Sequence, residues 1–199
     1  MSKKVKWAIF LCVMIVLSGV YSVIDKNNAI YDKSVDNEEY KAVRLMEHDT
    51  LQQSFYVKEE RLDGVNIKMS GSGDVKNASV AFVLTDENGQ KVVEGSQTLD
   101  QYKPGKFFSL KFDPITGCRE KEYTFALTVE RCGEDTEVLV YSVPEERSDT
   151  GLMVRGEAEE ETLALRTITH RFDLETFLVT LVFLMYVVLF MRWLVKIFK

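Results

Sequence analysis

Glu122–Glu130 read EYTFALTVE, and this stretch decides the fold because apolar and polar residues alternate along it. One side carries Tyr123, Phe125, Leu127 and Val129, and the other carries Thr124, Ala126, Thr128 and Glu130. A period of two residues is typical of a β-strand that buries one of its faces. The stretch therefore predicts a strand with one face in a hydrophobic core.

Similar short stretches lie on both sides of this one and are separated by turn residues. They are Leu51–Val57, Leu62–Met69, Ala78–Thr85, Gln90–Glu94, Lys106–Phe112, Glu137–Val143, Leu152–Arg155 and Thr162–Thr169. Ala78–Thr85 is apolar on both faces, which favours an interior strand. Asn88-Gly89 is typical of a hairpin turn. About nine antiparallel strands predict an all-β sandwich over residues 48–170, after a linker at residues 25–47.

The C-terminal stretch Phe177–Val195, FLVTLVFLMYVVLFMRWLV, has no charge before Arg192. A membrane core needs about 20 mostly apolar residues in one helix. Asp173 is suited to cap the start of such a helix, and Trp193 falls where interfacial aromatic residues gather. We therefore predict a transmembrane helix over residues 173–195.

A second apolar stretch, Trp7–Ile24, follows three lysines near the N-terminus. It has two interpretations: a cleaved signal peptide, with Val20-Tyr21-Ser22 as the cleavage site, or a retained transmembrane helix over residues 7–24. Its length favours the retained helix. Ser18, Gly19 and Ser22 give it a face of small residues, which predicts packing on the second helix or on a partner protein.

The charges predict the orientation of the chain. Basic residues flank the outer ends of both apolar stretches, so residues 1–6 and 196–199 are expected in the cytoplasm and the central domain outside the plasma membrane. All 31 acidic side chains fall between Asp25 and Glu175 with 19 of the 25 basic ones, giving the external part of the chain a net charge of −12. Such a charge argues against nucleic acid as a partner and against docking onto anionic lipid.

Several pieces of the sandwich together resemble a jelly-roll-like extracytoplasmic module of Gram-positive membrane glycosyltransferases and cell-envelope polysaccharide proteins. These pieces are Leu84-Thr-Asp86 with Gly89, Phe112-Asp-Pro-Ile115, Lys121-Glu-Tyr123-Thr-Phe125 and Leu163-Ala-Leu-Arg166. The likeness covers roughly residues 51–169, and it departs from the module at Gly117-Cys118. It implies a bacterial cell-envelope setting and supplies no catalytic residues.

No constellation of catalytic residues is evident. The two histidines, His48 and His170, lack ligand-spaced partners, and there is no Gly-x-Ser-x-Gly motif. We therefore expect no enzyme activity, cofactor or metal. Cys118 and Cys132 would lie outside the membrane, where a disulfide is allowed, but they flank one predicted strand at opposite ends. Whether they pair stays open.

Two functions fit these features. The first is a non-catalytic accessory or scaffold subunit for cell-envelope polysaccharide or glycolipid assembly, with a larger membrane protein as partner. The alternative is a membrane-tethered glycan-binding module. Both tryptophans lie in the apolar ends, so Tyr56, Tyr102 and Tyr141 are the candidates for stacking on sugar rings.

Overall fold

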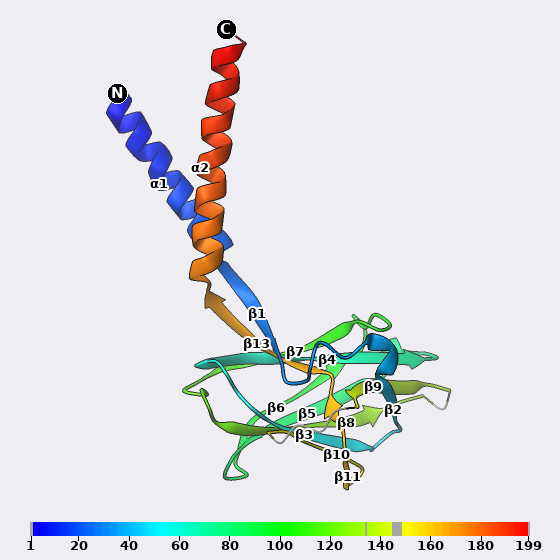
Figure 1. The fold of residues 1–199 in the computed structure, drawn as a ribbon. Coiled ribbons are helices and arrows are strands. Elements are labelled where there is room, and N and C mark those ends of the chain that lie inside the picture. The colour runs from blue at the N-terminus through cyan, green and yellow to red at the C-terminus, as the bar shows by residue number, and fades with distance from the viewer. Residues whose placement is uncertain (1, 134, 145–148, 199) are drawn as a thin grey trace. The chain divides into compact units, whose positions relative to one another are not determined.

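The computed structural model describes residues 2–133, 135–144 and 149–198. The chain forms two compact units. A helical unit combines Met1–Lys26 with His170–Lys199, and a β unit comprises Asn27–Thr169 (Figure 1).

The helical unit contains α1 (Lys3–Tyr21) and α2 (Leu174–Ile197), which contact each other. Asp173 caps α2 as predicted, because its carboxylate accepts hydrogen bonds from the Thr176 amide at 3.1 Å and from the Thr176 hydroxyl at 2.6 Å. The Arg192 guanidinium lies 4.6 Å from the centre of the Trp7 ring. The beginning of α1 therefore lies beside the last turns of α2.

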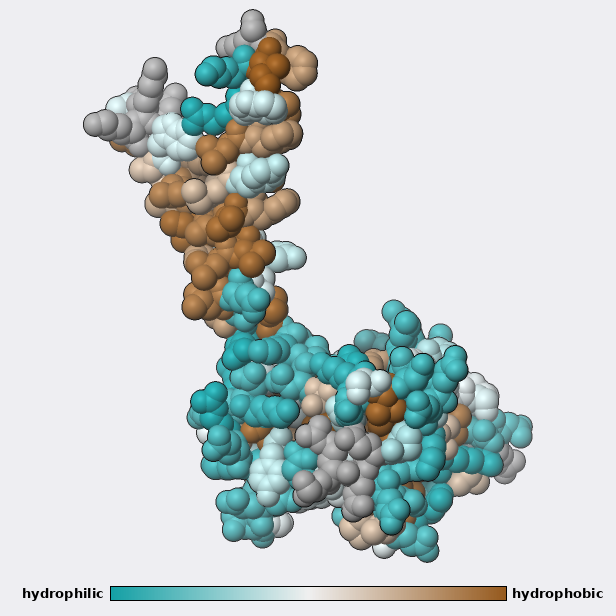
Figure 2. All heavy atoms as spheres, viewed as in Figure 1, coloured by the Kyte–Doolittle hydropathy of each residue, from teal (hydrophilic) through white to brown (hydrophobic). Residues whose placement is uncertain are grey.

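Apolar side chains cover both helices in the space-filling view (Figure 2). Within the described residues, however, only α2 is long and apolar enough to span a membrane. The apolar part of α1 is limited to Trp7–Tyr21. The prediction of a transmembrane helix over residues 7–24 is therefore wrong, whereas the prediction for the second helix is supported. α1 ends at Tyr21, and Val23 and Ile24 already belong to a strand.

Two antiparallel sheets make up most of the remaining chain. The strands are β1 (Val23–Ala29), β2 (Lys41–Leu45), β3 (Thr50–Tyr56), β4 (Arg61–Ser72), β5 (Ser79–Asp86), β6 (Lys91–Thr98), β7 (Phe107–Thr116), β8 (Glu122–Arg131), β9 (Glu137–Val143), β10 (Gly151–Val154), β11 (Glu157–Glu159), β12 (Thr162–Leu163) and β13 (Leu165–Phe172). Two short 3-10 helices, η1 (Asn37–Glu39) and η2 (Val75–Asn77), interrupt the loops. The seven-stranded sheet has the order β1-β13-β4-β9-β12, with β2 paired to β9 and β7 paired to β4. The six-stranded sheet has the order β11-β10-β3-β8-β5-β6.

The two sheets enclose one hydrophobic core, which confirms the predicted β-sandwich. On β8 the four residues predicted to face inward are all buried, whereas the alternate residues are not. β5 lies between β8 and β6, as expected for an interior strand. The Phe82 ring contacts Phe125 within its own sheet and Phe112 of β7 in the other sheet, both at 6.4 Å between ring centres.

The segment at residues 25–47 differs from the predicted linker. It contains most of β1 and the whole of β2, which pairs with β9 between Lys41 and Leu45. Leu45 is completely buried in the core. These residues extend the seven-stranded sheet, and the β unit begins well before the predicted boundary at residue 48.

A buried amide joins the two sheets through the core. The Gln53 side chain of β3 donates hydrogen bonds to the backbone carbonyls of Ser54 and Gly151, both at 3.0 Å. Its oxygen accepts a 2.7 Å hydrogen bond from the backbone amide of Leu163, in the other sheet. Gln53 is fully buried, and its hydrogen bond with Leu163 is buried as well, whereas the bonds to Ser54 and Gly151 are partly buried.

Candidate functional site: a basic and aromatic face

The three tyrosines proposed for sugar stacking have different environments. Tyr102 is buried in the core, so it is not accessible to a sugar, and that assignment is corrected. Tyr56 is exposed, and its hydroxyl lies 3.4 Å from the Glu122 carboxylate. The cavity beside Tyr56 has a volume of only about 10 Å³. Tyr141 is half-buried and packs into a second, smaller apolar cluster.

This smaller cluster lies on the side of the seven-stranded sheet that points away from the core. Lys68 of β4 pairs with Phe107 of β7, and its backbone amide donates to the carbonyl of Ala164 at 3.0 Å. Arg166 of β13 pairs with Asn66 of β4. Neighbouring residues on these strands, such as Ile67 and Leu165, point into the core, so alternation directs Lys68 and Arg166 outward.

Residues 30–40 fold over this side of the sheet and add two aromatic rings. The backbone amide of Ile30 donates to the carbonyl of Leu165 at 3.2 Å, which holds the segment to β13. The Tyr31 and Tyr40 rings meet edge to face at 6.0 Å between their centres. Asn37, on η1, accepts a 2.7 Å hydrogen bond from the Lys68 ammonium.

The cations and rings form a continuous series. The Lys68 ammonium lies 4.4 Å from the centre of the Tyr40 ring and 5.5 Å from that of Tyr141. The Arg166 guanidinium lies 3.8 Å from the centre of the Phe107 ring and donates to the Tyr31 hydroxyl at 3.0 Å. These distances are in the range of cation–π contacts. We call this surface the basic-aromatic face, made of Tyr31, Tyr40, Lys68, Lys106, Phe107, Tyr141 and Arg166.

One carboxylate lies near this face, because the pKa of the Tyr40 hydroxyl is raised by burial and also by the negative charge of Asp32. Within the part of the chain that the structure describes, Lys68 and Arg166 have no ion pair with a carboxylate. Burial lowers the pKa of the Lys68 ammonium, and the positive charges of Arg166 and Lys106 lower this pKa further. Lys68, Lys106 and Arg166 thus gather on one surface of a β unit whose net charge is −11.

A separate hollow of about 350 Å³ opens at the end of β3 and β10. Its lining is polar: His48, Asp49, Thr50, Gln52, Met153, Arg155 and Gly156. The Arg155 guanidinium already binds the Asp49 carboxylate and the Arg44 carbonyl, both at 3.2 Å. The hollow is large enough for a sugar unit, but its lining has no aromatic ring.

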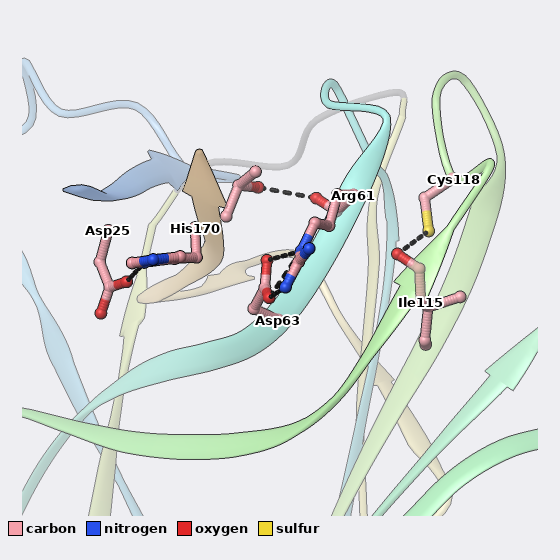
Figure 3. A network of polar contacts seen from close by, with 7 residues as sticks. Asp25, Arg61, Asp63, Ile115, Cys118 and His170 are labelled. Atoms are coloured by element: carbon pink, nitrogen blue, oxygen red, sulfur yellow. Dashed lines mark hydrogen bonds and ion pairs between the residues drawn. The ribbon is translucent and has the colours of Figure 1, made fainter. Parts of the chain in front are cut away.

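Figure 3 shows other polar groups that pair with one another. Arg61 of β4 holds the Asp63 carboxylate with contacts of 2.7–3.0 Å, and the Arg61 carbonyl accepts a 2.8 Å hydrogen bond from the Thr169 hydroxyl. In the helical unit, His170 Nδ1 lies 2.7 Å from the Asp25 carboxylate. Among the described residues, no three His, Cys, Asp or Glu side chains converge as metal ligands.

The cysteines are free. Cys118 is fully buried, with its thiol 3.3 Å from the Ile115 carbonyl, and Cys132 lies at the far end of β8 with its thiol 3.0 Å from the Thr136 carbonyl. The separation expected along one strand is therefore present, and the structure contains no Cys118–Cys132 disulfide.

The small residues of α1 occupy two environments. Ser18 and Ser22 are fully buried in the helical unit, and the Ser22 hydroxyl donates to the Gly19 carbonyl at 2.8 Å. Gly19 is partly exposed, and a Cβ atom at this position would meet nothing within 4 Å. Close helix approach through Ser18, Gly19 and Ser22 stays a prediction, and Gly19 itself permits a larger side chain.

Comparisons with known proteins give little guidance. No protein-family model matches the chain, and no curated protein matches it. Among solved structures it is similar to a Yersinia pseudotuberculosis-derived mitogen, with 11% identity, 56% of this chain and 91% of that chain covered, and a TM-score of 0.28. It is also similar to TmCBM61 in complex with β-1,4-galactotriose, with 13% identity, 65% and 88% covered, and a TM-score of 0.29.

A third similar structure is an active-site mutant of a family two carbohydrate esterase from Clostridium thermocellum. It is 9% identical, 69% of this chain and 34% of that chain are covered, and the TM-score is 0.29. These TM-scores are too low to support an argument about function.

Proposed function

We propose that this protein is a membrane-anchored module that binds a glycan on its basic-aromatic face and acts by binding, without catalysis. The observation that carries the proposal is the gathering of Tyr40, Tyr141, Lys68 and Arg166 from distant parts of the sequence on one accessible side of a sheet.

The chemistry of this face suits a sugar. A pyranose ring presents C–H groups, which pack against aromatic rings, and hydroxyl groups, which need hydrogen-bond partners. Tyr40 and Tyr141 supply rings, and Lys68 and Arg166 supply donors at the same surface. All four side chains are half-buried, so the backbone and the neighbouring rings support them while part of each stays open to a ligand.

The membrane setting of the proposal rests on α2. This helix is long and apolar enough to cross a bilayer, and the basic residues beyond Met191 favour a cytoplasmic C-terminus. The β unit would then face the outside of the plasma membrane. We further propose that it acts there as an accessory subunit in polysaccharide or glycolipid assembly.

The proposal includes a larger membrane protein as partner. If this is correct, the full chain extracted from its native membranes with a mild detergent will co-purify with a multi-spanning protein. A protein that elutes alone would contradict the partner and leave the glycan proposal standing.

Glycan binding is tested on the full chain in phosphatidylcholine nanodiscs, screened against a panel of envelope polysaccharides. We expect binding to at least one polysaccharide, and we expect Tyr40→Ala and Tyr141→Ala each to weaken it about tenfold, as aromatic stacking contacts do. Tyr56→Ala is the matched control and should leave the affinity unchanged. No binding at millimolar sugar would reject the proposal.

The hollow beside Arg155 is a second candidate site, because it is a largely polar cavity that is big enough for a sugar unit. The glycan would bind in this hollow if Thr50→Ala and Gln52→Ala weakened its binding and Tyr40→Ala did not. That result would place the binding site away from the basic-aromatic face.

A further inference from the structure

The basic-aromatic face offers aromatic rings for stacking and positive charges for binding an anion. A neutral sugar would use the rings but has no anionic group for the positive charges. Rings are available for stacking, and two full positive charges lie among them without a carboxylate partner in the described chain. Aromatic rings alone would serve a neutral saccharide. Partial burial of a cation without an ion-pair partner has a desolvation cost, so the presence of these half-buried cations needs its own explanation.

The positions of the cations give that explanation. Lys68 and Arg166 lie on adjacent strands, β4 and β13, and Lys106 lies beside β7 close enough for its charge to lower the pKa of Lys68. Three like charges on one small surface repel one another. An anion bound between them would relieve this repulsion and would gain charge-assisted hydrogen bonds.

The acidic surface of the rest of the β unit restricts anion binding to the basic-aromatic face. With 17 basic and 28 acidic side chains, the β unit carries a net charge of −11, so a polyanion is repelled from most of its surface. A local group of cations can still bind an anionic group of a ligand. Here the cations Lys68 and Arg166 lie beside the aromatic rings of Tyr40, Tyr141 and Phe107. A ligand that fits both parts carries its negative charge on or next to a ring with a C–H face.

We propose that the basic-aromatic face binds an acidic saccharide, whose carboxylate or phosphate group is held by Lys68 and Arg166 while its sugar ring lies against Tyr40 and Tyr141. This inference rests on the proposed glycan-binding function and adds the chemical class of the ligand. Tyr31 and Phe107 act as positioning residues, because they hold Arg166 through a hydrogen bond and a stacked ring and need not touch the saccharide.

The test uses two saccharides with the same sugar backbone: hexagalacturonate and its full methyl ester, in which the carboxylates are neutralised. The full chain is held in phosphatidylcholine nanodiscs, which have no net lipid charge. We expect hexagalacturonate to bind at least tenfold more tightly than the ester, with an affinity that falls as salt rises. Lys68→Met, which keeps the apolar stem, and Arg166→Gln should each weaken binding of the acid about tenfold.

Two variants serve as controls. Lys76→Met, on η2, makes the same change in net charge outside the face and should leave the affinity unchanged. Lys68→Arg keeps the charge and should retain most of the affinity. If Lys68→Met fails to fold in a thermal melt, Arg166→Gln and the comparison of acid with ester still decide the question.

The possible failures are distinguishable. Equal binding of acid and ester, unaffected by Lys68→Met, would overturn the acidic class and leave glycan binding intact. Full competition by inorganic phosphate at the concentration that saturates the saccharide would show a site for simple anions and would also overturn the inference. Absence of binding by both oligomers and by the whole polysaccharide panel would overturn the proposed function as well.

Discussion

The Lys68 ammonium lies 4.4 Å from the centre of the Tyr40 ring, and this contact joins β4 to a segment 28 residues earlier in the chain. The same ammonium donates to Asn37, which lies three residues before Tyr40 in the chain. Lys68 thereby fixes residues 37–40 over the sheet. The contact makes the outer side of the seven-stranded sheet a structured surface with both charge and aromatic rings.

The free energy of unfolding should fall at alkaline pH because Tyr123 is buried. Burial, followed by the hydrogen bond with Cys118, raises the pKa of its hydroxyl to about 12. Above pH 10 the unfolded chain loses this proton while the folded chain keeps it, so stability falls as pH rises from about 10 to 12. The loss is roughly 2–3 kcal/mol for a shift of two pKa units.

Urea unfolding of the wild type and of Tyr123→Phe between pH 8 and pH 12 measures this loss. The variant should lack the part of the decline that begins near pH 10, and it should keep the part due to Cys118, whose pKa burial also raises. Parallel stability curves for the two proteins would contradict the assignment.

His48 should be replaceable by glycine with a gain in stability. It is a non-glycine residue with a φ angle of 68°, in a turn where the Asp49 amide donates to the Met46 carbonyl at 3.0 Å. An L side chain is strained in this region, so His48→Gly should raise the free energy of unfolding by about 0.5–1 kcal/mol.

The matched opposite substitution is Gly89→Ala. Gly89 has a φ angle of 74°, and a Cβ atom there would meet nothing within 4 Å, so any loss is conformational. We expect the free energy of unfolding to fall by about 1 kcal/mol. Thermal and chemical denaturation of the two variants should move in opposite directions; a shift in the same direction would refute the argument from φ.

Gln53→Leu should be strongly destabilising although it replaces an amide with an apolar side chain of similar size. It would leave the Leu163 amide and the Gly151 carbonyl without their buried partner. We expect a loss of about 2–4 kcal/mol in the free energy of unfolding. Gln52→Leu, on the exposed side of the same strand, should change it by less than about 0.5 kcal/mol. Similar losses for both would show that Gln53 does not connect the sheets.

α2 should be the helix that anchors the chain. A protein truncated after Phe172 retains α1, whose apolar part is shorter than the roughly 20 residues that a span needs. We expect sodium carbonate at high pH to release this protein from membranes, whereas the full chain stays in the pellet. Retention of the truncated protein would show that α1 is sufficient as an anchor.

The sequence predicted the interior strands better than the edges. β8, β5 and β4 bury whole rows of apolar side chains, and this burial leaves a pattern of alternation in the residues. β11, with the sequence EAE, buries nothing, and β1 and β2 bury little. Backbone hydrogen bonds place such strands, and backbone bonds leave no pattern in the side chains.

The candidate site was largely beyond sequence analysis for a related reason. Tyr141 was selected as one isolated aromatic residue, and nothing in the sequence links it to Tyr40 or to Lys68. The link depends on the pairing of β4 with β9 and on the path of residues 30–40, and both are non-local. The sequence places Lys68, between Ile67 and Met69, on the polar side of a strand. It does not indicate which aromatic rings of other segments lie beside this lysine.

The most direct test of the acidic-saccharide proposal is an NMR titration of the tyrosine rings. The full chain contains eight tyrosines, which can be labelled selectively and assigned with Tyr→Phe variants in nanodiscs. On addition of hexagalacturonate we predict that the ring signals of Tyr40 and Tyr141 shift together, and that those of Tyr56 and Tyr102 do not. Shifts confined to Tyr56, or no shift at saturating saccharide, would contradict the proposal.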